Sequence, residues 1–318
     1  MHPITYGMSP EYTASPKPDV GMVEMNISNL CNLECLTCVR HAPDYIQPEP
    51  VLLNLQQFKV IVERFPELPK LQICGFSEPT MNKDLPEMIT FAKESGVKHV
   101  EMFTNGTLLT EKMTSRLAKG GLDLLRTSID GGDAETYRRV RGADLNKVIK
   151  NVRHFAEQTS VPVRMESVLS AHVANSVEKL PDVAAAVGAK WLSIRLLDGQ
   201  DHNLEANSMY EPSYLKSLKE KLGSSCEKYG IELIMALPGE QDFASRCTAW
   251  DEVYVDETGG LVPCYLSGTK PVGNLLESTF DEIWETQGQQ FLSQKEDGGG
   301  FLDSCSCNYA LVAQNKVK

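Results

Sequence analysis

Short apolar runs and amphipathic stretches alternate along roughly the first two thirds of the chain. Each run is rich in Val, Ile, Leu and Met and ends in a polar or glycine-containing segment, a pattern typical of strands buried on both faces. Six of these runs are predicted to be strands, and they cover residues 20–28, 70–75, 98–106, 123–130, 161–169 and 189–197. Strands that alternate with helices indicate an α/β fold with a parallel sheet and right-handed crossovers.

Helical periodicity fills the intervals between these strands. Asn54 and Gln57 form a capping pattern ahead of an apolar stripe, which predicts a helix start. A second amphipathic stretch, over residues 85–92, is predicted to stop at Gly96. Further helices are predicted over residues 113–118, 145–157, 177–188 and 215–229. In parallel barrels the site gathers at the carboxyl ends of the strands, so we expect functional residues in the loops that follow them.

Composition and charge exclude several classes of protein. The chain has 318 residues, 42% of them hydrophobic, enough for a large core and two domains. Its net charge of −12 argues against nucleic acid as a partner, because phosphate binding needs a basic field. No run reaches the roughly 18 apolar residues of a membrane helix, and the first residues do not form a secretory signal. We therefore expect a cytoplasmic protein that does not associate with a membrane. In that location a framework of disulfide bonds is not expected either.

Nine cysteines divide into a triplet, a dispersed quartet and two single residues. The triplet is Cys31, Cys35 and Cys38, the quartet is Cys247, Cys264, Cys305 and Cys307, and the singles are Cys74 and Cys226. Structural zinc prefers four ligands in two close pairs, and the triplet supplies only three. A [4Fe–4S] cluster also needs four ligand positions, so three thiolates would leave one iron open for substrate chemistry.

The C-x3-C-x2-C spacing of the triplet, followed by four further motifs in order, resembles the radical S-adenosylmethionine (SAM) superfamily. Those motifs are GFSEP (75–79), TNG (104–106), TSIDG (127–131) and YRRVRG (137–142). The resemblance implies a partial (β/α)6 TIM-type barrel whose open iron chelates the amino and carboxylate groups of SAM. One electron then cleaves SAM to methionine and a 5′-deoxyadenosyl radical, which implies a flavodoxin- or ferredoxin-type electron donor.

The resemblance also assigns roles to individual side chains. Glu78 and its adjacent backbone would bind the methionine amino group, and Arg141 would bind the carboxylate. Ser128 and Asp130 occupy SAM-facing positions, although Ser77 and Thr37 depart from the usual motif residues. The neighbouring Arg138 and Arg139 are expected to be solvated.

Three strand-end residues are left with two interpretations each. Asn105 belongs either to the site or to an ordinary Asn-Gly turn. Either Glu166 or Ser167 should face the barrel, and Glu166 is a candidate for a ribose or substrate contact, because a buried glutamate needs a partner. Arg195 is expected either to line a polar cavity or to be paired in the core.

The last third of the chain resembles a SPASM auxiliary-cluster domain in its shortened "twitch" form, with one extra [4Fe–4S] centre. Residues 246–268 read as a hairpin around Thr-Gly-Gly, and the quartet would hold the cluster. Because Cys305 and Cys307 are separated by one residue rather than the usual two, one or both are expected to be ligands; a zinc site stays the alternative. The expected division is an extension over 1–20, the barrel over 21–235 and the auxiliary domain over 236–318.

We expect oxidation or epimerisation of a small polar substrate that is carbohydrate- or aminoglycoside-like. Few residues precede the first strand, which disfavours a leader-binding domain, but modification of a peptide or protein side chain stays an alternative. A non-catalytic iron–sulfur or zinc scaffold is the outside alternative. An epimerase would need a hydrogen donor, for which Cys226 and Cys74 are candidates, although the apolar stripe around Cys226 predicts a core residue.

Overall fold

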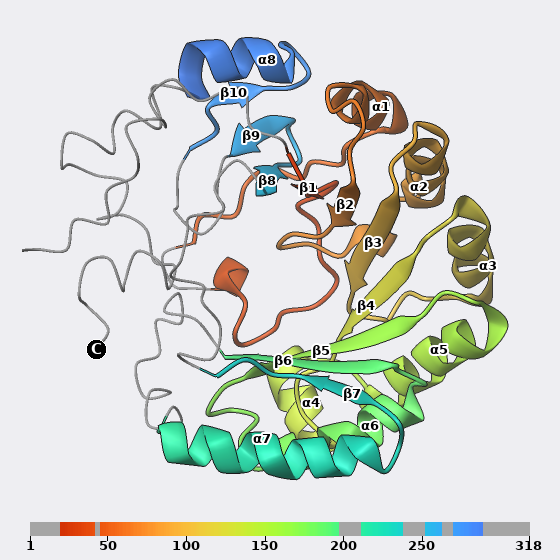
Figure 1. The fold of residues 1–318 in the computed structure, drawn as a ribbon, viewed down its shortest axis with the longest axis vertical. Coiled ribbons are helices and arrows are strands. Elements are labelled where there is room, and N and C mark those ends of the chain that lie inside the picture. The colour runs from red at the N-terminus through yellow and green to blue at the C-terminus, as the bar shows by residue number, and fades with distance from the viewer. Residues whose placement is uncertain (1–19, 42–44, 197–210, 238–251, 263–269, 289–318) are drawn as a thin grey trace, which may run out of the picture.

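The computed structural model describes residues 20–41, 45–196, 211–237, 252–262 and 270–288. A ten-stranded sheet curves round, and its helices cover the convex side (Figure 1). The strand order is β10-β9-β8-β1-β2-β3-β4-β5-β6-β7. The strands are β1 (Met22–Met25), β2 (Lys70–Ile73), β3 (His99–Thr104), β4 (Leu124–Ser128), β5 (Val163–Leu169), β6 (Trp191–Leu196), β7 (Glu232–Ile234), β8 (Glu252–Val255), β9 (Gly260–Val262) and β10 (Gly273–Asn274).

The six predicted strands form in the predicted order and pair in parallel, which confirms the barrel-type α/β fold. The sheet is longer than predicted at both edges. β7 adds a parallel strand beside β6, and β8 pairs in parallel with β1. The hairpin expected around Thr-Gly-Gly is the antiparallel pair β8–β9, and through β8 it continues the same sheet.

Helices follow most strands. They are α1 (Leu55–Glu63), α2 (Leu85–Glu94), α3 (Glu111–Gly120), α4 (Ala134–Arg141), α5 (Leu145–Gln158), α6 (Leu180–Ala186), α7 (Pro212–Glu227) and α8 (Phe280–Ile283). The capping box of α1 forms as predicted, since Asn54 Oδ1 accepts from Gln57 N and Gln57 Oε1 accepts from Asn54 N. Helix α4 was not predicted. Asp133 caps its start, and Gly142 ends it with a φ of 69°.

The two faces of the sheet differ in polarity because side chains alternate along each strand. The outward positions are apolar and fully buried with the helices in one core, as Val23, Leu71 and Leu125 illustrate. The inward positions of the same strands are polar, with Glu24 and Gln72 as examples. No helix in the described part of the chain is long and apolar enough to cross a membrane.

We expect the substitution Asn54→Ala to lower the free energy of unfolding by about 0.5–2 kcal/mol, because it leaves Gln57 N without an acceptor. Gln56→Ala, at the exposed second residue of the same helix, is the matched control and should be close to neutral. Urea denaturation followed by circular dichroism measures both variants. Equal midpoints for the two would show that the capping box does not stabilise α1.

Candidate active site

The cysteine triplet lies in the loop that follows β1 and is fastened to the last turn of α4. Leu36 N donates to Val140 O at 2.8 Å, and the Cys35 thiol lies 4.0 Å from Arg141 O. Within the loop, Cys38 N donates to Cys35 O at 3.1 Å. The backbone that presents the thiols is therefore held by α4, the helix missed by the sequence analysis.

Cys31, Cys35 and Cys38 are free thiols of intermediate exposure on this loop. Burial raises the pKa of Cys35 to about 11 and raises that of Cys31, so metal binding has to displace their protons. Within the described ranges, no three His, Cys, Asp or Glu side chains are gathered closely enough for a single metal ion. The triplet fits a cluster, because thiolates of a [4Fe–4S] centre bind separate irons.

Glu78 joins the end of β2 to the end of β3. Its carboxylate is 1% exposed and accepts hydrogen bonds from Thr104 Oγ1 at 2.7 Å and Asn105 N at 2.6 Å. It also accepts from Thr80 N at 3.1 Å and from the Thr80 hydroxyl. Burial raises the pKa of Glu78, while these hydrogen bonds act in the opposite direction. The side chain is thus committed to shaping the GFSEP loop, whose Gly75 and Phe76 are exposed.

Asn105 closes the turn after β3 and also contacts the cysteine loop. Its Oδ1 accepts from Thr107 N at 2.9 Å, which closes the turn, and Gly106 follows with a φ of 73°. Its Nδ2 donates to Asn32 Oδ1 at 2.9 Å. Asn32 belongs to the cysteine loop, so the turn after β3 also supports that loop.

Asp130 and Arg141 form a buried ion pair below the cysteine loop. Arg141 Nη1 lies 2.8 Å from Asp130 Oδ2, and Val168 N donates to Asp130 Oδ1 at 2.7 Å. Arg141 Nε is buried and has no hydrogen-bond partner within the described residues. Asp130 therefore orients the Arg141 guanidinium, and the N–H group at Nε is left to donate to a ligand. Ser128 shares the inward face with Asp130, and Arg138 and Arg139 are exposed as expected.

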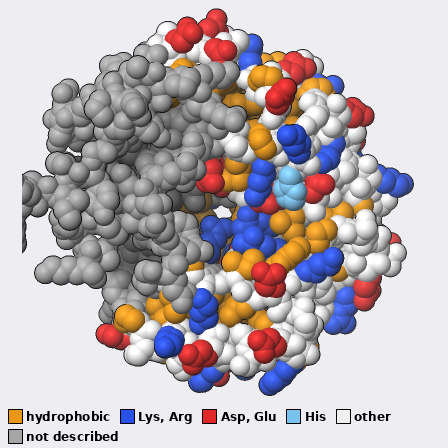
Figure 2. Space-filling view, viewed as in Figure 1, with side chains coloured by type: hydrophobic (Ala, Val, Ile, Leu, Met, Phe, Trp, Pro, Cys, Tyr) orange, Lys and Arg blue, Asp and Glu red, His pale blue; other side chains and the backbone are white. Residues whose placement is uncertain are grey.

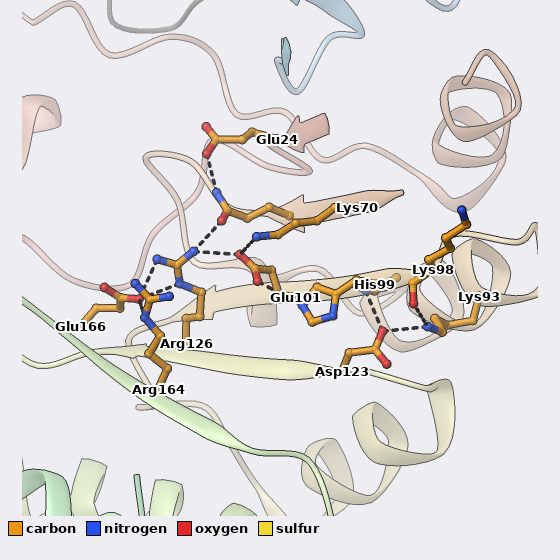
Figure 3. A network of polar contacts seen from close by, with 12 residues as sticks. Glu24, Lys70, Lys93, Lys98, His99, Glu101, Asp123, Arg126, Arg164 and Glu166 are labelled. Atoms are coloured by element: carbon orange, nitrogen blue, oxygen red, sulfur yellow. Dashed lines mark hydrogen bonds and ion pairs between the residues drawn. The ribbon is translucent and has the colours of Figure 1, made fainter. Parts of the chain in front are cut away.

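The inner wall carries a polar network centred on Arg126 (Figure 3). Arg126 Nε lies 2.7 Å from Glu166 Oε1, and Arg126 Nη1 lies 2.7 Å from Gln72 Oε1 and 2.8 Å from Glu101 Oε1. Gln72 Nε2 continues the network to Glu24 Oε1 at 2.5 Å.

Glu166, not Ser167, is thus the residue of β5 that faces the interior. The sequence analysis missed Arg126, Glu101 and Glu24. The available signal was a polar residue at every second position of otherwise apolar strands.

The two single cysteines lie on opposite sides of the sheet. Cys226, on α7, is 1% exposed within the apolar core, as its position on the apolar stripe predicts. Cys74 follows β2 on the inward side, where Gln72 Nε2 lies 3.5 Å from its sulfur. The quartet lies outside the described residues: Cys247, Cys264, Cys305 and Cys307.

Two family profiles match the chain. The Radical SAM superfamily matches residues 25–169, which hold the triplet, Glu78, Arg141 and Glu166. An iron–sulfur cluster-binding domain, SPASM, matches residues 247–308, which hold the quartet. These domains imply a [4Fe–4S] cluster, SAM and an auxiliary iron–sulfur cluster as the cofactors.

The chain is similar to several known proteins at low sequence identity. A probable GTP 3′,8-cyclase of Methanococcus vannielii is 26% identical over 78% of this chain and 86% of its own. An AdoMet-dependent heme synthase of Methanosarcina barkeri is 25% identical over 80% of this chain and 79% of its own. The crystal structure of Streptococcus suis SuiB bound to S-adenosylmethionine has a TM-score of 0.69 at 17% identity, over 92% of this chain and 74% of SuiB. This chain is a radical SAM enzyme with a C-terminal SPASM iron–sulfur domain.

Proposed function

We propose that this radical SAM enzyme abstracts a hydrogen atom from a C–H bond of a small, polar, carbohydrate-like substrate and thereby oxidises or epimerises it. The observation that carries the proposal is the inner wall of the barrel, which carries polar side chains from β1 to β5 (Figure 3). Hydroxyl-rich molecules match such a wall, because buried polar groups need hydrogen-bond partners. Several relatives are probable GTP 3′,8-cyclases, whose name specifies a small molecule, and this also favours a small substrate over a peptide.

Most of the predicted site residues have a role in this proposal. When bound, the triplet's cluster would supply the electron that cleaves SAM, delivered by a flavodoxin- or ferredoxin-type donor. Arg141, oriented by Asp130, would bind the SAM carboxylate, while Glu78 would hold the exposed backbone of residues 75–77 toward the amino group. Ser128 would face SAM, and Glu166 would contact the SAM ribose or the substrate. The barrel would span residues 21–235, and the auxiliary domain residues 236–318.

Deuterium transfer tests the substrate class directly. The anaerobically reconstituted enzyme, with SAM and dithionite, would be offered perdeuterated sugars and, separately, perdeuterated peptides. Mass spectrometry then detects deuterium in 5′-deoxyadenosine. Incorporation from a sugar supports the proposal, and incorporation from a peptide alone would replace it with peptide modification.

The combined substitution Cys31→Ala, Cys35→Ala and Cys38→Ala should abolish 5′-deoxyadenosine formation, because no electron source would then adjoin SAM. Cys226→Ala is the matched control and should retain it, since Cys226 lies in the core behind the sheet. Liquid chromatography of reduced reaction mixtures measures the product. Persistent cleavage by the triple variant would show that the triplet does not hold the SAM cluster.

Loss of the auxiliary cluster should not prevent the cleavage of SAM. With one extra cluster the wild type should bind about eight irons per chain, and the triple variant about four. We expect Cys264→Ala to lose product while it still forms 5′-deoxyadenosine without coupling. Iron analysis and product quantification measure the two effects, and full product yield from Cys264→Ala would remove the second cluster from the mechanism.

We expect Glu78→Gln to weaken SAM binding, because the amide introduces N–H donors beside Asn105 N and the Thr80 and Thr104 donors. An unmet buried donor costs about 1–3 kcal/mol, so the variant should also be less stable by that amount. Glu34→Gln, exposed in the cysteine loop, is the matched control. Calorimetric titration of SAM into reconstituted protein measures the affinity, and iron content shows whether the cluster is retained. A stability loss without any change in SAM affinity would limit Glu78 to a structural role.

A further inference from the structure

Arg195 is an inward-facing arginine at the end of β6 that the network around Arg126 leaves largely unused. Its side chain is 56% exposed, whereas that of Arg126 is 8% exposed. Its Nε lies 4.0 Å from Glu166 Oε2, too far for a hydrogen bond, and its guanidinium lies 5.8 Å from the ring centroid of Phe103. Among the described residues these are the contacts of its charged group. The N–H groups of the Arg195 guanidinium are therefore available to donate hydrogen bonds to a ligand.

Glu166 is shared between Arg195 and two other arginines, which lie closer to it. Arg126 Nη2 lies 2.7 Å and Arg164 Nε lies 2.9 Å from the same oxygen, Glu166 Oε1. Glu166 Oε2 is buried and accepts no hydrogen bond within the described part of the chain. Three guanidiniums, which stay charged at any ordinary pH, thus surround one carboxylate.

The inward side chains of β2 to β6 carry more positive than negative charges among the described residues. The positive side chains from β2 to β6 are Lys70, Arg126, Arg164 and Arg195, and the carboxylates facing them are Glu101 and Glu166. Glu24, across on β1, contributes a third carboxylate, which Gln72 binds. Glu252 on β8 lies close enough to Glu24 to raise its pKa, so the positive surplus among the described residues is confined to β2–β6. Figure 2 shows Lys and Arg side chains gathered at the centre of the described face.

This surplus is local, since the whole chain has a net charge of −12. Charges confined in a partly enclosed interior repel one another unless a counter-charge accompanies them. A guanidinium fork matches a carboxylate or phosphate with two parallel hydrogen bonds. The ring of Phe103 lies between two arginines, with the Arg126 guanidinium 4.1 Å and the Arg195 guanidinium 5.8 Å from its centroid.

We infer that the substrate carries an anionic group, a carboxylate or a phosphate, which the Arg195 guanidinium binds on the inner wall of β6. The inference rests on the proposed function and narrows its substrate class to acidic carbohydrates such as sugar phosphates or uronic acids. It disfavours polycationic aminoglycosides, which the same arginines repel. Arg164, whose Nη2 donates to Ser193 Oγ at 3.1 Å, stands beside Arg195 and adds to the attraction.

Calorimetric titration of the reconstituted, SAM-saturated enzyme tests this inference without turnover. The probes are glucose 6-phosphate, glucuronate and inorganic phosphate, with glucose and glucosamine as the neutral and cationic counterparts at equal ionic strength. We expect the anionic probes to bind more tightly than their counterparts. Arg195→Gln should weaken their binding roughly tenfold or more, which is the range for a charge-assisted hydrogen bond, and Arg195→Lys should weaken it less.

Lys221→Gln, which removes an exposed charge on α7, is the control and should change nothing. Equal affinity for glucose and glucose 6-phosphate, or unchanged affinity in Arg195→Gln, would overturn the inference. A selective loss of SAM affinity in Arg195→Gln would also overturn it, because the anion would then be the SAM carboxylate. 5′-Deoxyadenosine formation by the wild type is scored separately, so failure of the radical chemistry is not confused with failure of the anion site.

Discussion

One buried guanidinium constrains the inner wall of the barrel. Arg126 is charged and almost removed from water, which is tolerated only where partners replace the lost hydration. Its partners, Glu166, Glu101 and Gln72, come from three other strands. Removing one partner of such a buried pair typically costs about 3–5 kcal/mol. The register of four neighbouring strands is therefore tied, because a slip by one residue would turn a partner to the helix side.

The apolar outward face of the sheet stabilises the fold, and the polar inward face is available for chemistry. The outward side chains and the helices form the apolar core, so the inward side chains need not supply hydrophobic burial. The loops at the strand ends are then joined to one another by buried polar contacts. Glu78 links the ends of β2 and β3, and Asp130 links β4 to α4 and β5. The cysteine loop consequently rests on neighbours whose positions are already fixed.

Local sequence patterns were sufficient to predict the features of the fold that depend on short-range interactions. The six strands, the α1 capping box and the motifs at the strand ends all follow from short-range periodicity and spacing. Helix α4 was missed because Arg138, Arg139 and Arg141 dominate a short stretch with few apolar residues. The pairing of β8 with β1 joins segments more than 200 residues apart, and no local signal encodes it. The orientation of Glu166 depended likewise on Arg126, whose role appears only when the strands are side by side.

The position of the two single cysteines bears on the type of reaction. A hydrogen atom returned to a substrate in the interior has to come from the inward face, and Cys226 lies in the core behind the sheet. Among the described cysteines outside the triplet, Cys74 is the one on the inward side, and burial together with Glu24 raises its pKa, so it stays a protonated thiol. A redox-neutral reaction would therefore take its hydrogen atom from Cys74, on the inner wall near Gln72 and Glu24. An oxidation needs no such donor, because the auxiliary cluster would take the electron from the substrate radical.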